Sequence, residues 1–121
     1  MVAGEVGRMS TPFACDMTAL SSEQRVRHYE LAALLHFSLL AVHELSDGYD
    51  FEFAWSSDTY SALAELTPLE HACCPFFDIG IHIESGSNKL YWRLTGQEGI
   101  KAFIRAEFGK WFTENLTANQ R

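Results

Sequence analysis

The sequence predicts an α+β fold: a two-layer sandwich in the order α-β-β-α-β-β-α, with helices on one face of a four-stranded, mainly antiparallel sheet. Two observations lead to this prediction. Two hairpins with alternating apolar and polar residues are each followed by a segment with a helical apolar stripe. Each strand also has only one apolar face, so the helices are expected to cover a single side of the sheet.

The first helix is expected to begin after Ser21 and to end near His36. Ser21 and Gln24 have the spacing of a capping box, in which side chains bind the first free amides of a helix. The apolar stripe that follows consists of Leu31, Leu34 and Leu35. His28 and His36 are eight residues apart, and we expect both at the surface or boundary of this helix.

The first hairpin is expected to turn at Ser46–Gly48, because Asp-Gly readily adopts the positive φ of a tight turn. Phe37–Leu45 forms its first arm. Its second arm is Tyr49–Trp55, where aromatic residues alternate with Asp50 and Glu52, and this alternation is typical of a half-buried strand. The polar residues should therefore face away from the helices.

The second hairpin is expected to turn at Ser85–Asn88 and to lead into the last helix. Thr95–Glu98 has the form of a Thr-x-x-Glu capping box, so we predict that Thr95 caps this helix. The helical stripe that follows consists of Ile100, Phe103, Ile104, Phe108 and Trp111.

The helix between the hairpins is expected to break near Thr67. Proline inside a helix costs ~3 kcal/mol, whereas at the first helical position it costs almost nothing. Thr67–Glu70 also has the form of a capping box, with Pro68 at the first helical position and Glu70 as the partner of Thr67. We therefore predict a short separate helix from Pro68 to about Cys74.

The length of 121 residues fits one domain. We predict a disordered leader at residues 1–12, a single α+β domain at residues 13–112 and a flexible tail at residues 113–121. Met1–Ser10 contains no apolar stretch, so no signal peptide is expected. The longest apolar run, Leu31–Val42, is far shorter than the ~20 residues of a membrane span.

The net charge and the cysteine content limit the classes of partner and the cellular compartment that we expect. The net charge of −7 and the scattered basic residues argue against nucleic acid and against a membrane surface. Three cysteines, an odd number, predict free thiols in a reducing cytoplasm. A four-stranded sheet leaves two edges, and a homodimer that pairs edges or stacks sheets would cover them.

The adjacent residues Cys73 and Cys74 are the strongest candidate for chemistry. Glu70 precedes them by one helical turn, so the three side chains can point the same way. With Cys15 they form our predicted metal set, and His71 and Asp16 are predicted to line the site. Thiolates select soft ions, and arsenite or a mercurial would fit three thiols better than zinc would. The predicted function is a small cytoplasmic binding protein for a thiophilic metal or metalloid ion.

Two alternatives stay open. In the first, the cysteines are core residues of a structural or small-molecule-binding domain, because free cysteine packs as a small hydrophobe. In the second, the protein is an enzyme in which Cys73 or Cys74 is a nucleophile or redox thiol and His71 its base. His71 and Cys73 are two residues apart, however, and do not face each other on a helix. Catalysis is therefore the less favoured alternative.

Three motifs together resemble a family of small, uncharacterised bacterial proteins. These are Cys-Asp-x-Thr at Cys15–Thr18, Glu-x-x-Cys-Cys-Pro-Phe at Glu70–Phe76 and Thr-Gly-x-Glu-Gly at Thr95–Gly99. The resemblance covers about residues 13–109 and brings no activity with it. It implies that the three motifs belong to one design, which favours a position of Cys15 near Cys73 and Cys74.

Overall fold

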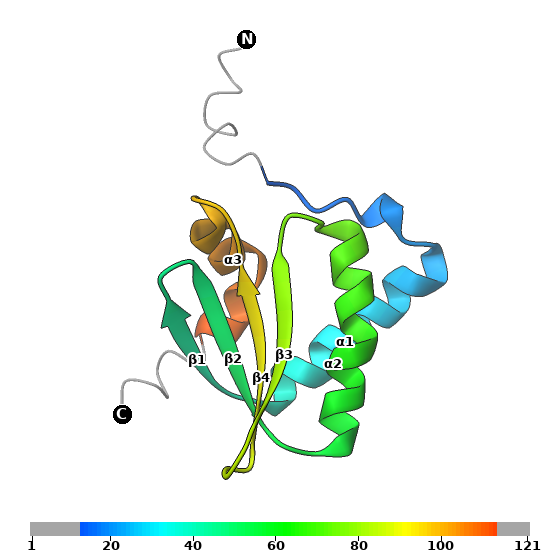
Figure 1. The fold of residues 1–121 in the computed structure, drawn as a ribbon. Coiled ribbons are helices and arrows are strands. Elements are labelled where there is room, and N and C mark those ends of the chain that lie inside the picture. The colour runs from blue at the N-terminus through cyan, green and yellow to red at the C-terminus, as the bar shows by residue number, and fades with distance from the viewer. Residues whose placement is uncertain (1–12, 114–121) are drawn as a thin grey trace.

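The computed structural model describes residues 13–113 and confirms the predicted α+β class (Figure 1). The elements in chain order are a 3₁₀ helix η3 (Met17–Ala19), α1 (Ser22–Ser38), β1 (Leu39–Leu45), β2 (Gly48–Ala54), α2 (Ser57–Cys73), β3 (Asp78–Glu84), β4 (Lys89–Thr95) and α3 (Ile100–Glu107). The predicted leader at 1–12 and residues 114–121 of the predicted tail lie outside the described residues. Thr113, where that tail was predicted to begin, is helical.

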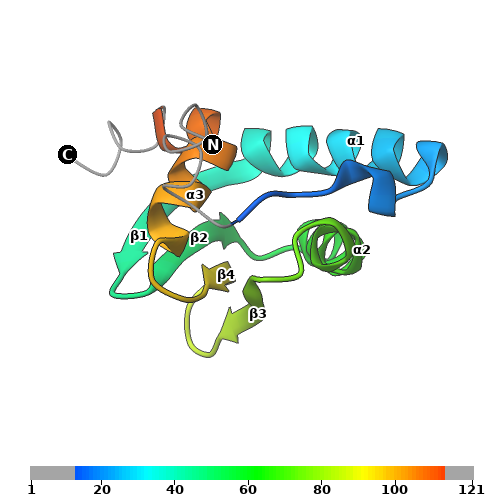
Figure 2. The same cartoon turned by 90° about the horizontal axis from the view of Figure 1, so that it is seen from above.

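The sheet has the strand order β1-β2-β4-β3, and all its pairs are antiparallel. Each hairpin contributes one edge strand and one central strand. A row of apolar residues crosses the sheet in register, from Val42 through Phe51 and Trp92 to Ile81. The helices lie on the face that this row presents, which makes the two layers of the sandwich (Figure 2).

The core lies between these two layers. Phe51, Phe53 and Trp92 are fully buried on the sheet side, while Leu35 and Leu63 are fully buried on the helices. Burying a side chain of this size stabilises the fold by roughly 1.5–3 kcal/mol. The indole nitrogen of Trp92 donates a hydrogen bond to the hydroxyl oxygen of Thr67 at 3.0 Å, which satisfies the one polar atom of this side chain. The core thereby fixes α2 on the sheet.

The outer face of the sheet is polar, but two of its carboxylates are covered. Asp50 and Glu52 are each only 7% exposed. Arg93 reaches Asp50 through two hydrogen bonds, of 3.1 and 2.8 Å. Glu52 accepts from His43 at 2.6 Å. These cross-strand pairs join β2 to both of its neighbours, whereas the predicted homodimer stays a prediction.

The predicted break in the second helix is wrong, because α2 runs without interruption from Ser57 to Cys73 with Pro68 inside it. Pro68 cannot donate to the carbonyl of Ala64, but both residues are exposed and water can reach this side of the helix. Thr67 does not begin a helix. Its hydroxyl donates to the carbonyl of Leu63 at 2.7 Å, one turn back.

The predicted cap of the last helix is also wrong. Thr95 is the final residue of β4 and is paired with Gly48 and Asp78 in the sheet. The helix α3 begins five residues later, after Gly99, whose φ of 93° lies in the left-handed region. Sheet pairing therefore outweighs the local capping preference of Thr95, and a glycine makes the turn into the helix.

Gly48 and Gly80 provide a matched test of the sheet. A Cβ atom at Gly48 would lie 1.9 Å from the carbonyl oxygen of Leu94, whereas one at Gly80 would meet nothing within 4 Å. We expect Gly48→Ala to lower the free energy of unfolding by about 3 kcal/mol, the upper end for overpacking, because the backbone it meets cannot move aside. Gly80→Ala should change it by less than about 0.5 kcal/mol. Urea unfolding measures both, and equal midpoints would contradict the close approach of β2 to β4.

Candidate functional site

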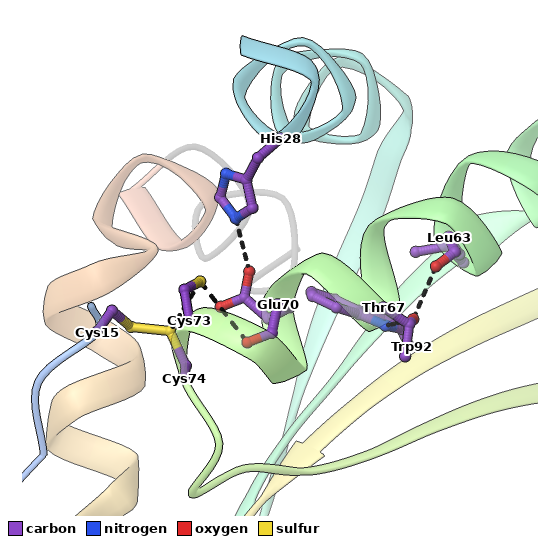
Figure 3. Close-up of polar contacts among 8 residues, drawn as sticks. All are labelled: Cys15, His28, Leu63, Thr67, Glu70, Cys73, Cys74 and Trp92. Atoms are coloured by element: carbon purple, nitrogen blue, oxygen red, sulfur yellow. Dashed lines mark hydrogen bonds and ion pairs between the residues drawn. A yellow bond between two sulfur atoms is a disulfide. The ribbon is translucent and has the colours of Figure 1, made fainter. Parts of the chain in front are cut away.

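The candidate site lies at the C-terminal end of α2, where three segments meet (Figure 3). Cys73 is the last residue of α2, and Cys74 is its C-cap with a non-helical backbone. The segment before η3 runs beside them, because the amide of Asp16 donates to the carbonyl of Cys73 at 2.8 Å. This backbone hydrogen bond satisfies a carbonyl at the helix end and brings Cys15 to the vicinal cysteines.

Cys15 and Cys74 form a disulfide, so the expectation of three free thiols is wrong. Their Cα atoms are 4.6 Å apart, within the usual range for such a bond. The two residues are separated by 59 positions, and the chain-entropy model assigns such a crosslink a stabilisation of about 4 kcal/mol. Disulfides are commonest in oxidising compartments, so cysteine content no longer argues for a cytoplasmic location.

Cys73 keeps a free thiol that is only 1% exposed. Its sulfur lies 3.6 Å from the sulfur of Cys74 and 3.7 Å from the carbonyl oxygen of Glu70. Burial, together with the negative charge of Glu70, raises the pKa of Cys73 to about 11. At neutral pH the residue is therefore a protonated thiol, which is a poor nucleophile.

Glu70 is a buried carboxylate, 3% exposed, that faces α1 rather than the backbone of its own helix. It accepts a hydrogen bond from Nε2 of His28 at 2.9 Å. The predicted pairing of Glu70 with Thr67 is therefore wrong. His28, predicted at the surface or boundary of its helix, lies at the boundary, with 13% of its side chain exposed. The sequence did hold a signal for His28, since it precedes the buried residues Leu31 and Leu35 by three and seven positions.

Glu107, at the end of α3, is a second acidic residue of the site that the sequence analysis did not identify. Desolvation is the largest cause that raises the pKa of Glu107. The negative charge of Glu70 raises this pKa further, whereas His28 lowers it. Glu107 follows the buried Phe103 and Ile104 at helical spacing, which is the sequence signal that could have revealed it. The buried carboxylate of Glu70, the half-buried imidazole of His28 and the exposed carboxylate of Glu107 thus lie close enough to influence one another electrostatically.

A cleft of about 560 Å³ opens over this region. Its walls come from α1, from the end of α2 and from residues 106–111, and they include His28, Glu70 and Glu107. The three cysteines also line it. The cleft therefore borders the cysteines and carboxylates, although Cys73 and Cys74 are each only 1% exposed.

Among the described residues, two groups of side chains have the spacing that a metal ion needs. The ligand atoms of Cys15, Glu70 and Cys74 all lie within 4.8 Å of one another, and so do those of His28, Glu70 and Cys73. Glu70 belongs to both groups. In the disulfide form the sulfurs of Cys15 and Cys74 are bonded to each other and have no thiolate to offer.

The structure brings together Cys15, Glu70, Cys73 and Cys74, the four predicted metal ligands. The two predicted lining residues take other positions. His71 is exposed and lies outside the residues that line the cleft. Asp16 is exposed as well, and its carboxylate caps η3 by accepting from the amide of Thr18 at 3.0 Å. Asp16 contributes to the site through its backbone amide and, as a minor cause, through its negative charge, which adds to the raised pKa of Cys73.

None of the described helices combines the length and the apolar character that crossing a membrane requires. Comparisons of the chain with protein-family models, with curated proteins and with solved structures found no significant match.

The raised pKa of Cys73 predicts an unusual alkylation profile. In the native disulfide form, labelling by iodoacetamide should stay slow at pH 8 and rise only as the pH approaches about 11, because only the thiolate reacts. In urea the same residue should label with a midpoint near ~8.5. Mass spectrometry counts the label on Cys73. A native midpoint between pH 8 and 9 would contradict the effect of burial.

Proposed function

We propose that the reduced protein binds a thiophilic metal or metalloid ion through Cys15, Cys73 and Cys74, with the carboxylate of Glu70 beside the sulfurs. The observation that carries this proposal is the hydrogen bond from the amide of Asp16 to the carbonyl of Cys73, 2.8 Å long. Because this bond involves only backbone atoms, it holds Cys15 next to α2 when the disulfide is reduced. The sulfurs then stay together as thiols.

The geometry suits a soft ion. Ligands at ~2.3 Å from a common ion lie up to ~4 Å apart, and the sulfurs of Cys73 and Cys74 are 3.6 Å apart. Thiolates prefer soft ions to hard ones. Arsenous acid is a suitable probe: its arsenic forms a bond to each of three thiol sulfurs, and its three hydroxyl groups leave as water with the thiol protons. The cleft is lined by all three cysteines, so a small local opening of its walls would bring such a solute to the sulfurs.

The disulfide would be the closed state of this site. It uses two of the three sulfurs, so binding requires a reductant such as a phosphine or a cellular dithiol. The predicted cytoplasmic location belongs to the same proposal, because a reducing compartment keeps the cysteines as thiols.

The structural alternative has one observation in its favour, the disulfide itself. A crosslink between the N-terminal segment and α2, next to a buried thiol, also fits a domain whose cysteines only stabilise the fold. The two functions differ in the reduced state: a binding protein gains stability from an added ion, whereas a purely structural set of cysteines gains none.

The test is a titration of phosphine-reduced protein with arsenite, followed by calorimetry and thermal unfolding. We expect one arsenic per chain and a higher Tm. Replacing Cys15, Cys73 or Cys74 singly with Ser should weaken binding at least tenfold, because each removes one sulfur ligand. All variants are compared in reduced form, so that loss of the disulfide does not contribute to differences in affinity or Tm.

The oxidised wild-type protein is the matched control and should not bind arsenite. Equal affinity of the reduced wild type and its Cys15→Ser variant would exclude the three-sulfur site. Failure of the reduced protein to bind arsenite would leave the structural alternative.

A further inference from the structure

We propose that the disulfide form carries a cation site of its own, in which His28, Glu70 and Cys73 bind a borderline divalent ion such as Zn²⁺. The site shares Glu70 and Cys73 with the arsenite site but needs neither Cys15 nor Cys74. Because the disulfide uses two of the three sulfurs of the arsenite site, the His28–Glu70–Cys73 site would be the one that remains available to an ion in the oxidised protein.

The three ligands come from two packed helices. Glu70 and Cys73 are one turn apart on α2, and His28 reaches them from α1 (Figure 3). Their ligand atoms lie within 4.8 Å of one another, and the closest pair, Nε2 of His28 and Oε1 of Glu70, is 2.9 Å apart. Ligands of a common zinc ion lie about 3–4 Å apart, so small side-chain rotations bring all three to bonding distance.

The donor set is the one that zinc uses. One imidazole nitrogen, one carboxylate oxygen and one thiolate sulfur are all zinc ligands, whereas harder ions prefer oxygen alone. Three protein ligands leave a fourth position for water or for a further side chain. The cleft provides room for water, and Glu107, which also lines it, provides a second carboxylate.

The charges of the site favour a cation. Glu70 is nearly inaccessible to water, and its negative charge disfavours ionisation of Glu107 in the same cleft. A buried carboxylate such as Glu70 is costly unless hydrogen bonds or a positive charge compensate it. His28 donates a hydrogen bond to Glu70, and a divalent ion would compensate the charge of Glu70 and of the exposed Glu107 beside it.

His28 also has an unsatisfied polar atom. Its Nε2 binds Glu70, but its Nδ1 is buried without a hydrogen-bond partner among the described residues. Buried polar atoms without a partner are uncommon, and each calls for a ligand, an ion or a water molecule. Because His28 lines the cleft, a water molecule there would be available to Nδ1 while Nε2 faces Glu70 and the proposed ion.

The test uses Co²⁺ as a spectroscopic probe on the oxidised protein, without reductant. We expect one cobalt per chain, visible bands of a tetrahedral centre and a near-ultraviolet band from sulfur-to-cobalt charge transfer. Zn²⁺ should displace the cobalt and abolish these bands. Cys73→Ala should remove the near-ultraviolet band, because this residue supplies the only free thiol of the oxidised chain.

Two further variants separate binding from folding. His28→Gln keeps a hydrogen-bond donor for Glu70 but lacks a metal-binding nitrogen, so it should fold and bind cobalt at least tenfold more weakly. Glu107→Gln should raise the Tm of the metal-free protein, because it removes the repulsion with Glu70, and should weaken cobalt binding. His71→Ala, an exposed histidine of the same helix, is the control and should bind as the wild type does.

Different experiments test the arsenite site of the reduced protein and the cation site of the oxidised protein, so one proposal can fail without the other. The Cys15→Ser/Cys74→Ser double variant cannot hold arsenite through three sulfurs, yet it should retain the cobalt site. Absence of cobalt binding at millimolar concentration, cobalt binding without the charge-transfer band, or equal binding by His28→Gln would each overturn the His28–Glu70–Cys73 site. None of these results bears on arsenite binding by the reduced protein.

Discussion

The buried contact between Glu70 and His28 is the interaction on which both the helical layer and the site depend. A carboxylate at this depth is tolerated only with a partner, and His28 supplies it from α1 at 2.9 Å. Leaving a buried polar group without its hydrogen-bond partner costs about 1–3 kcal/mol, and more for a charged group. Desolvation raises the pKa of Cys73 and of Glu107, and the charge of Glu70 raises both further, so one carboxylate joins two helices and adds to the shifts of the groups around it.

The disulfide gives the chain two states with different properties. With Cys15 bonded to Cys74, the N-terminal segment is linked covalently to α2 and the fold gains the stability of a long-range crosslink. On reduction this stability is lost, but two more sulfurs become available beside Cys73. In the disulfide form the hydrogen bond from Asp16 to Cys73 holds the segment of Cys15 beside α2, and it involves only backbone atoms, not the sulfurs.

The sheet supports the candidate site, although the residues of that site come from the helices and the N-terminal segment. Its two hairpins are joined by the central pair β2 and β4, and ion pairs on the outer face strengthen the contact between neighbouring strands. Trp92 binds Thr67 and fixes the middle of α2 to this rigid surface. The end of α2 is thereby held in place, which keeps the geometry of Glu70, Cys73 and Cys74 constant as the first helix and the last helix pack around them.

The sequence by itself determined the elements whose signals are local. Alternation in Tyr49–Trp55 predicted a strand, Asp47-Gly48 predicted its turn, and the Ser21–Gln24 box predicted the start of α1, because these patterns act over a few residues. Local signals failed where tertiary contacts outweighed them. Thr95 has capping chemistry but pairs in the sheet, and Pro68 is accommodated because its side of α2 faces solvent.

Only the tertiary structure decided the composition of the site. The sequence drew attention to Cys73 and Cys74 because they are adjacent, but their partners are far away along the chain: Cys15 is 59 positions from Cys74, and His28 is 42 positions from Glu70. No periodicity spans such distances. Burial patterns could place His28 on the inner stripe of its helix, yet only the packing of α1 on α2 determined that a carboxylate lies opposite it.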